Sequence, residues 1–361
     1  MNRILLKETL HYSNKMKTKL FNISFLLFFL LVNLNSQAQQ DIHFAQFYEL
    51  PMLRNPSLAG IFNGNIRFTA AYRNQWQSIT VPYRTMALGT EIKILRGLAE
   101  GDFMTIGLQV TNDEAGDSKL RRTQLLPVIN YHKLLNEEKS TLLSLAFMGG
   151  VVSERFDPTA LKFDDQFVNG SYNSSNTTSQ TFTKTGFSYL DADVGLSLSS
   201  LINENTKFYI GAALFHFNNP RLTFMKDQSV ILNRKWGLNA GLTYKIGNIG
   251  KLVFYGDHFR QGANRITQLG FLFSYNFIPA AEDAQLSISA GAIFRLNDAI
   301  APVVKLNKDK WSLGLSYDTN ISSLKKASNF RGGFEMTLSL IDPWKRDDSE
   351  VDKTKCPTNI W

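Results

Sequence analysis

The chain has 361 residues, with 39 Lys or Arg against 31 Asp or Glu, a formal net charge of +8 and one cysteine, Cys356. The basic residues form no cluster of the kind that nucleic-acid binding needs. One cysteine also excludes an internal disulfide and a cysteine-based metal site, so another device, such as a closed hydrogen-bonded sheet, must hold the fold together.

The first segment predicts a secretory signal peptide. Three lysines in residues 15–19 precede an apolar run, Phe21–Leu34, and small residues occupy the two positions that a signal peptidase reads, Ser36 and Ala38. The apolar run, about 14 residues, is shorter than the roughly 20 that a spanning helix needs. We predict that residues 1–38 are removed by cleavage after Ala38.

The next segment, FAQFYELPMLRNPSLAG (Phe44–Gly60), is rich in aromatic residues and contains two prolines. Pro51 and Pro56 lack backbone donors and argue against a strand here. The apolar side chains of this segment need burial. We interpret residues 39–63 as a plug or lid at the periplasmic mouth of a downstream barrel; the alternative is a docking segment for a partner.

From residue 64 onward, apolar and polar residues alternate again and again. In WSLGLSYDT, for example, Trp311 and Tyr317 share an apolar face, and Ser312 and Asp318 share the other. Such alternation over eight or more residues predicts β-strands with one apolar face. We expect about fourteen strands, at 64–76, 82–95, 102–113, 120–135, 140–155, 188–200, 206–218, 233–247, 250–261, 264–277, 284–296, 298–306, 310–319 and 329–341.

Two architectures fit these strands, a soluble β-sandwich array and a membrane β-barrel. The polar faces contain mostly Gly, Ser, Asn and Thr with isolated charges, and the apolar faces carry aromatic residues near strand ends, as in Trp236 and Tyr244. A hydrated lumen and an aromatic girdle at each membrane interface explain both features. We therefore predict an all-β, antiparallel transmembrane barrel of about fourteen strands in the outer membrane, spanning residues 64–341, with a polar tail at 342–361.

The longest connection, residues 157–187, is rich in Asn, Ser and Thr and almost uncharged. A loop of this length in a compact domain is functional or mobile. We interpret it as a contact surface for a partner.

No motif in the chain predicts catalysis or a cofactor. The four histidines after residue 38 stand in no nucleophile elbow or metal-ligand spacing. Asp191 and Asp193 share one strand face, where they would either bind calcium or form a solvated polar face. We expect a protein that is not an enzyme and holds no metal or cofactor.

Charges of both signs alternate onto the predicted lumen face. A charged group is tolerated there, whereas facing lipid at the midplane it costs about 2–4 kcal/mol. We expect these residues to hold either the N-terminal segment or an inserted cargo domain; the alternative is structural packing of the lumen. They are Arg73, Glu91, Lys93, Asp193, Lys245, Arg295, Asp318 and Glu335.

Several short motifs, in this order and spacing, together resemble the PorP/SprF family of the Bacteroidota. The N-terminal segment resembles the family's opening motif at Phe44, Gln46, Asn55, Pro56 and Gly60, and YRNQW (Tyr72–Trp76) follows it. FRLNDAI, GLSYDTNISSL, GGFEMTLSL and the terminal Cys-Pro pair resemble later family segments, so the similarity extends from about residue 41 to the end. In the family an aromatic residue follows that pair almost at once, whereas here Trp361 comes four residues after Pro357.

The resemblance implies an outer-membrane component of the type IX secretion system. Such a protein would help to export or surface-attach a secreted cargo, often an adhesin used in cell adhesion or gliding motility, by binding its C-terminal sorting domain. The implied partners are that cargo, the secretion machinery and outer-membrane lipid, and no nucleic acid. The alternative functions are a passive porin or small-molecule transporter and a scaffold linked to a motor through periplasmic turns. Our candidate partner- or plug-binding residues are Arg73, Gln75, Trp76, Asp193, Arg295, Asp318 and Glu335.

Overall fold

The computed structural model describes residues 41–77, 81–96, 101–182, 184–225, 228–277, 286–323 and 325–342. The predicted signal peptide, most of the predicted tail and Cys356 lie outside these ranges. Among the residues described, no helix is both long enough and apolar enough to span a membrane.

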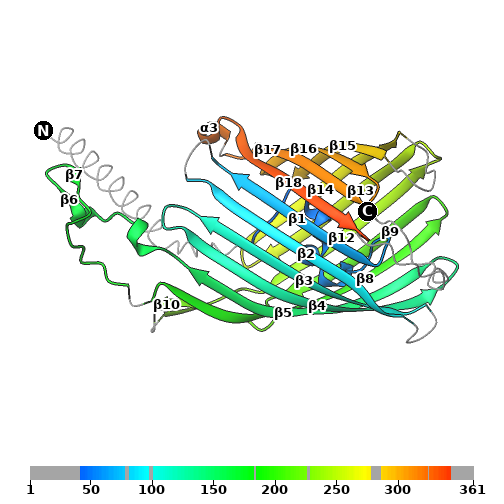
Figure 1. The fold of residues 1–361 in the computed structure, drawn as a ribbon, viewed down its shortest axis with the longest axis horizontal. Coiled ribbons are helices and arrows are strands. Elements are labelled where there is room, and N and C mark those ends of the chain that lie inside the picture. Colours follow the sequence, from blue (N-terminus) through cyan, green and yellow to red (C-terminus); the bar gives the residue numbers. More distant parts are fainter. Residues whose placement is uncertain are drawn as a thin grey trace, which may run out of the picture. The chain divides into compact units, whose positions relative to one another are not determined.

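Fourteen antiparallel strands close into one barrel (Figure 1). Their bounds are β1 Ile66–Gln75, β2 Tyr83–Arg96, β3 Phe103–Ala115, β4 Leu120–Asn136, β5 Thr141–Arg155, β8 Gly186–Asn203, β9 Thr206–Phe215, β12 Lys235–Ile246, β13 Gly250–Gln261, β14 Asn264–Asn276, β15 Leu286–Arg295, β16 Ala299–Lys308, β17 Trp311–Asn320 and β18 Arg331–Ile341. Each overlaps one predicted run, and the predicted barrel is confirmed.

The first and last strands close the barrel. β1 pairs with β18 from Arg67–Ile341 to Gln75–Gly333, and every other barrel strand pairs with its neighbours along the chain. A closed sheet leaves no unpaired edge, which a lipid bilayer requires of any sheet that crosses it.

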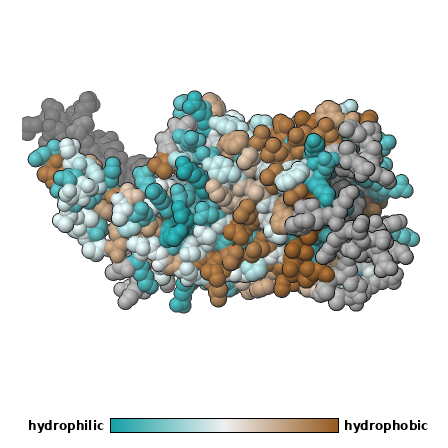
Figure 2. Space-filling model, in the orientation of Figure 1, coloured by the Kyte–Doolittle hydropathy of each residue, from teal (hydrophilic) through white to brown (hydrophobic). Residues whose placement is uncertain are grey.

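The alternation of the sequence sets the two faces of the wall. On β12, Trp236 and Tyr244 are 58% and 46% exposed, whereas Asn239 and Thr243 are buried in the lumen. Figure 2 shows apolar side chains gathered over the outer face of the barrel. This apolar outer face matches the hydrocarbon of a membrane, where burial of apolar side chains is favourable.

The two ends of the barrel differ. Mostly short connections join the strands at what we call the turn end, where β1 begins and β18 ends: 97–102, 137–140, 204–205, 247–249, 277–285 and 309–310. The loop end carries longer connections, at 156–185, 216–234 and 321–330, and short ones at 76–82, 116–119, 262–263 and 296–298. In outer-membrane barrels short turns face the periplasm and longer loops face outward.

The long connections contain small elements of their own. The first holds two 3-10 turns, η3 (Pro158–Ala160) and η4 (Asp164–Gln166), and a hairpin, β6 (Phe167–Val168) with β7 (Ser171–Tyr172). The second holds the hairpin of β10 (Arg221–Met225) and β11 (Gln228–Ile231), and a short helix, α3 (Lys325–Ser328), precedes β18.

Residues 41–65, which we call the N-segment, run through the lumen (Figure 1). The two prolines begin short helical turns there, as expected of residues that cannot join a sheet ladder. The turns are η1 (Phe47–Glu49), α2 (Pro51–Arg54) and η2 (Pro56–Leu58). Phe44, Leu50 and Leu58 are each at most 3% exposed.

The sequence suggested that this segment lies at the periplasmic mouth of the barrel, but the N-segment extends further into the lumen. Asp41 contacts Lys235, at the loop end of β12, and Asn65 binds Asp342, at the turn end of β18. The segment therefore crosses the lumen from the loop end to the turn end. The reason is that its polar groups find partners on the wall along this whole path.

Candidate functional site

The candidate site is the contact between the N-segment and the lumen wall. Near the closing seam, the Glu335 carboxylate accepts hydrogen bonds from the backbone N–H groups of Ala45, at 2.7 Å, and Gln46, at 2.6 Å. The Gln46 side chain continues this contact, since its Nε2 donates to Ser316 and its Oε1 accepts from Thr337. Hydrogen bonds to a charged acceptor are among the strong ones in proteins.

An ion-pair chain lies beside these bonds. Arg73 and Arg295 both donate to Asp318 Oδ2, at 2.7 and 2.8 Å, and Arg73 also donates to the backbone carbonyl of His43. Four predicted residues, Arg73, Arg295, Asp318 and Glu335, therefore meet in one network on β1, β15, β17 and β18.

Arg54 anchors the middle of the N-segment. Its guanidinium donates to both carboxylate oxygens of Asp257, at 2.7 and 2.6 Å, and to the Tyr209 hydroxyl at 2.7 Å. The side chains of Arg54 and Asp257 are 2% and 0% exposed. Such a two-point contact fixes orientation as well as charge.

Asn55 is fitted against two glycines of the wall. Its Nδ2 donates to the carbonyls of Leu196 and Ala212, each at 3.2 Å, and its Oδ1 accepts from the Ser57 N–H at 3.0 Å. A Cβ at Gly195 would overlap Asn55 Oδ1, and one at Gly211 would lie 2.7 Å from Asn55 Nδ2. The wall is shaped to the segment here, because only glycine leaves the necessary space.

We expect Gly195→Val to displace the N-segment from the lumen wall. The new side chain overlaps Asn55, and overpacking of this kind costs about 1–3 kcal/mol. Hydrogen exchange should show faster exchange at the Ser57 and Leu58 amides. Gly256→Ala is the matched control, because a Cβ there meets only a Leu269 methyl at 3.5 Å; equal exchange in the two variants would contradict this fit.

The end of the N-segment is bound to β2 and β4. Gly60 N–H donates to Glu91 at 2.7 Å, and Lys93 donates to the Phe62 carbonyl at 2.7 Å. On β4, Asn130 Nδ2 donates to the carbonyls of Ser57 and Ala59. Two further predicted lumen charges, Glu91 and Lys93, thus contact the segment.

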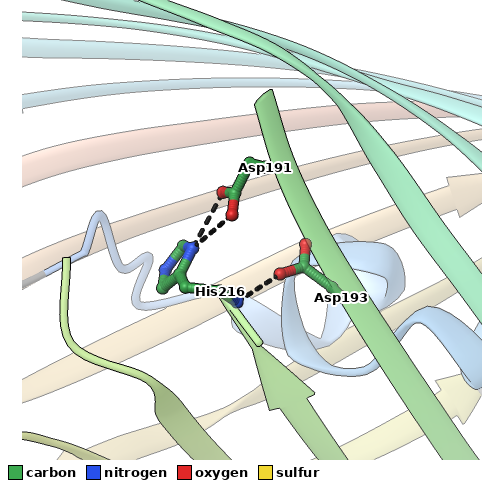
Figure 3. A group of neighbouring side chains, drawn as sticks. All are labelled: Asp191, Asp193 and His216. Atoms are coloured by element: carbon green, nitrogen blue, oxygen red, sulfur yellow. Dashed lines mark hydrogen bonds and ion pairs between the residues drawn. The ribbon is translucent and has the colours of Figure 1, made fainter. Parts of the chain in front are cut away.

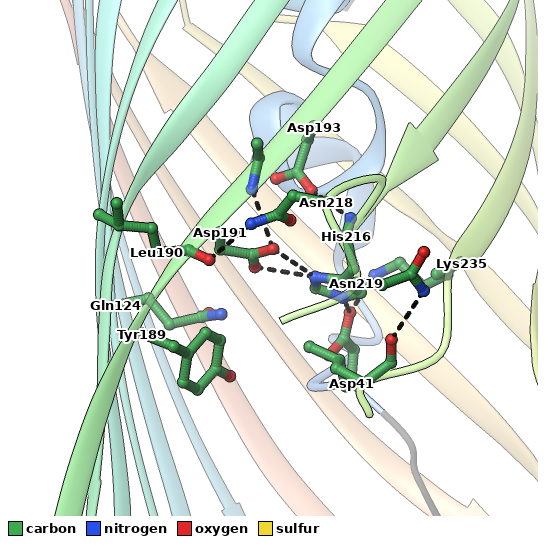
Figure 4. Close-up of polar contacts among 12 residues, drawn as sticks. Asp41, Gln124, Tyr189, Leu190, Asp191, Asp193, His216, Asn218, Asn219 and Lys235 are labelled. Carbon is green, nitrogen blue, oxygen red and sulfur yellow. Dashed lines mark hydrogen bonds and ion pairs between the residues drawn. The ribbon is translucent and has the colours of Figure 1, made fainter. Parts of the chain in front are cut away.

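A separate cluster holds the start of the N-segment at the loop end (Figure 4). The Asp41 carboxylate pairs with Lys235 at 2.7 Å, with Arg122 at 2.9 Å and with His216 Nε2 at 2.8 Å. The other ring nitrogen, His216 Nδ1, lies 2.8 Å from Asp191, and Asp193 accepts the His216 backbone N–H. The imidazole therefore links Asp41 of the segment to Asp191 of the wall.

Asp191, Asp193 and His216 also have the donor set of a metal site (Figure 3). One ligand atom from each lies within 4.8 Å of the others. However, the His216 ring bonds two carboxylates, and Arg122 and Lys235 also face Asp41. We therefore assign the three residues to an ion-pair network.

Raising the pH should loosen the loop-end cluster. Burial alone lowers the pKa of His216, which lies just beyond β9, but the carboxylates of Asp41 and Asp191 outweigh burial and raise it to about 9. An unfolded histidine titrates near 6.5. The stabilisation is therefore full below about pH 6.5 and is lost as the pH rises through about 9.

The measurement is hydrogen exchange of the Ile42 and His43 amides between pH 7 and 10, corrected for the intrinsic rate. We expect protection to fall across this range in the wild type. His216→Gln should remove this pH dependence, because glutamine does not titrate. An identical pH profile in the variant would contradict the assignment.

A small cavity of about 50 Å³ lies between the N-segment and strands β12 to β14. Its lining is mostly apolar and includes Phe44, Phe47, Leu50 and Phe259. A water needs roughly 10–15 Å³ of such space, so the cavity has room for a few waters or for the end of one apolar side chain.

Two predicted site residues lie apart from the N-segment contacts. Gln75 ends β1, where it pairs with Gly333 and Tyr83, and the Trp76 ring stands edge-on to Tyr83 with centroids 5.0 Å apart. Asp193 is also not part of the Arg73 network and belongs to the loop-end cluster. Alternation places side chains on a face but does not say which of them meet.

Sequence reasoning missed Asp41, Arg54, Asp257, Tyr209 and His216. Arg54 had a usable signal, since it is the one charged residue between the two prolines of an otherwise mostly apolar stretch. A buried arginine requires a carboxylate, and Asp257 and Tyr209 stood at lumen-facing positions. The Asp41 cluster joins residues up to 194 positions apart, and no local pattern marks it.

The family model of the type IX secretion system membrane protein PorP/SprF matches residues 36–340. No curated protein matches the chain.

Solved barrels resemble the chain only distantly. The Ralstonia pickettii toluene transporter TbuX has a TM-score of 0.44 at 9% identity, with 81% of this chain and 91% of that chain covered. CdiB from Acinetobacter baumannii has a TM-score of 0.41 at 10% identity, with 76% of this chain covered. The chain spans 60% of the length of CdiB.

Proposed function

Because the chain belongs to the PorP/SprF family of type IX secretion system membrane proteins, we propose that it is an outer-membrane barrel that assists secretion or surface attachment of one cargo. It does so by binding the cargo's C-terminal sorting domain and without catalysing a reaction. Family membership over residues 36–340 is the observation that carries this proposal. The barrel lies in the outer membrane, and the family implies association with the secretion machinery. We propose further that the chain matures by cleavage near Ala38.

The occupied lumen favours cargo binding over the alternative of a passive porin. The N-segment contacts the wall through ion pairs and hydrogen bonds from the loop end to the turn end. A passive porin, in contrast, has an aqueous channel through the centre of its barrel. In our proposal Arg73, Asp318 and Glu335 therefore retain the N-segment, and the cargo binds outside the lumen.

The longest connection at the loop end is our candidate for the cargo contact. Residues 157–187 carry exposed apolar side chains, Phe167, Val168 and Phe182. Phe182 stands edge-on to Phe156, which packs in the same way on Phe224 of β10. An exposed apolar surface that packs on aromatic side chains suits the recognition of another protein.

The surface proteome tests the proposal. We compare a strain that lacks the barrel, the same strain with the wild-type chain restored, and the strain with residues 165–181 replaced by a short Gly-Ser linker. We expect one or a few large proteins with a C-terminal sorting domain to disappear from the surface without the barrel and to return with the wild type.

The linker variant should fail to restore that protein if the loop is the contact. The amount of the linker variant in the outer membrane and the heat-modifiable migration of this variant show whether it folds. An unchanged surface proteome, together with a loss of small-solute uptake, would contradict the cargo proposal and favour the porin.

A further inference from the structure

Three exposed arginines lie close together at the loop end, on the outer face of the barrel. They are Arg234, Arg260 and Arg265, which we call the arginine rim. Arg234 comes directly before β12, and Arg260 and Arg265 lie on β13 and β14. Arg260 is the cross-strand partner of both Trp236 and Arg265. Because Trp236 is 58% exposed on the outer face, the pairing places the arginines on that face too.

The arginine rim carries positive charge without a carboxylate to balance it. Within the ranges that the structure describes, none of the three guanidinium groups forms an ion pair. Like charges directly opposite each other on neighbouring strands are destabilising, so Arg260 and Arg265 repel each other unless an anion lies between them. On the outer face of β3 and β4, in contrast, Arg121 pairs with Glu114. The arginine rim is therefore a candidate binding site for an external anion.

A hollow of about 540 Å³ lies beside the arginine rim. The residues that line it are Asn219, Asn233, Arg234, Trp236, Arg260 and Gly262. A second hollow at the loop end, of about 570 Å³, has the carboxylates of Glu114 and Asp117 among its lining residues. The hollow beside the arginine rim is thus the better fit for an anionic group, and it has the size of an ordinary ligand site.

The outer face becomes apolar with distance from the arginine rim. The next outward-facing pair along β13 and β14 is polar, since His258 Nδ1 lies 2.8 Å from Thr267 Oγ1. Two pairs further, Phe254 and Phe271 are 43% and 38% exposed, with ring centroids 5.2 Å apart. Trp236 lies at the level of the rim, and tryptophan is enriched at the interface between membrane and water. This order matches a lipid, in which a charged headgroup, a polar linkage and acyl chains follow one another.

We propose that the arginine rim binds the phosphorylated headgroup of one lipid in the outer leaflet of the membrane. The phosphate lies between Arg260 and Arg265, because guanidinium groups donate to phosphate at two points. The hollow beside Arg234 holds the sugar or glycerol that carries the phosphate, and the acyl chains lie along Phe254 and Phe271. This site lies on the membrane side of the wall and does not depend on the cargo proposal.

Native mass spectrometry of the intact barrel, purified from the outer membrane and freed of lipid in a neutral detergent, measures this binding. The probe is lipid A with its phosphates, and the comparison is the same lipid after removal of its phosphates. We expect the wild type to bind one phosphorylated lipid A about tenfold more tightly than the dephosphorylated form. Inorganic phosphate at the same concentration should not displace the lipid, because it lacks the acyl chains.

Two double variants separate the arginine rim from the charge of the loop end as a whole. Arg260→Gln with Arg265→Gln should weaken binding of phosphorylated lipid A by about tenfold, since two charge-assisted contacts are lost. Heat-modifiable migration shows whether the variant folds.

Arg84→Gln with Arg155→Gln is the matched control. It removes the same charge from exposed positions on β2 and β5 at the loop end. The nearer strand, β5, lies four strands from β13, which is about 19 Å along the wall. This distance exceeds the Debye length of about 8 Å at physiological salt, so we expect the affinity of the control to equal that of the wild type.

Three outcomes would overturn the proposal. The first is equal affinity of the wild type for the two forms of lipid A. The second is equal weakening in the two double variants, which would assign the binding to the overall charge of the loop end. The third is displacement of lipid A by inorganic phosphate at the same concentration, which would make the arginine rim a site for free phosphate.

Discussion

Deleting residues 41–62 should convert the barrel into an open channel. The deletion removes the side chains that fill the lumen, among them Phe44, Leu50, Arg54 and Leu58. The lumen charges that lose their partners, such as Glu335 and Asp257, then face water, which is a tolerated environment for them in a barrel. We expect single-channel conductance in planar bilayers to rise by roughly tenfold or more over the wild type.

Two controls keep this prediction falsifiable. Heat-modifiable migration and circular dichroism show whether the shortened chain closes its barrel. Where it does not, Gly195→Val on the full-length chain serves in its place, because it disturbs the same segment at one contact. A wild type that already conducts as well as the deletion would show that the N-segment does not block the lumen.

Arg54→Met should destabilise the barrel by about 3–5 kcal/mol, the usual effect of removing one partner of a buried ion pair. The change leaves the Asp257 carboxylate without its guanidinium in a site where its side chain is fully buried. The hydrogen bond that Asn239 Nδ2 donates to Asp257 at 3.1 Å remains, but the two from the guanidinium are lost. The free energy of unfolding in urea, with the barrel in phospholipid vesicles, measures the effect.

A second substitution tests the reason for this loss. Arg54→Met combined with Asp257→Leu should recover most of the stability, because an apolar pair of similar volume often replaces a buried ion pair without loss. Lys133→Met is the matched exposed control. Its pair with Asp102 is 49% exposed on the lysine side, and the buried Asp102 carboxylate keeps its hydrogen bonds from the Tyr131 hydroxyl and the Leu134 backbone N–H. We therefore expect a change below about 1 kcal/mol. Equal losses in the single and double variants would argue against a buried-charge penalty.

The strands could be predicted because each carries its own signal. Alternation along 233–247 predicted a strand, and β12 occupies Lys235–Ile246. The same alternation assigned Arg73, Asp318 and Glu335 to the lumen. A face of a strand is a local property, and the period of two reveals it without knowledge of the rest of the chain.

The path of the N-segment could not be predicted in the same way. Pro51 and Pro56 excluded a strand, and the aromatic side chains required burial, but neither says where in the lumen a segment lies. The path depends on distant partners, such as Asp257 for Arg54 and Asp342 for Asn65. Gly195 and Gly211 mark where the segment approaches the wall, but glycines are common in these strands for other reasons.

The most direct test of the proposed function is affinity purification of the intact barrel from its native outer membrane, followed by mass spectrometry of whatever accompanies it. We expect a stoichiometric large surface protein, retained through its C-terminal sorting domain. A barrel that is purified alone, and that conducts ions steadily with its N-segment intact, would contradict the cargo proposal and favour a passive porin.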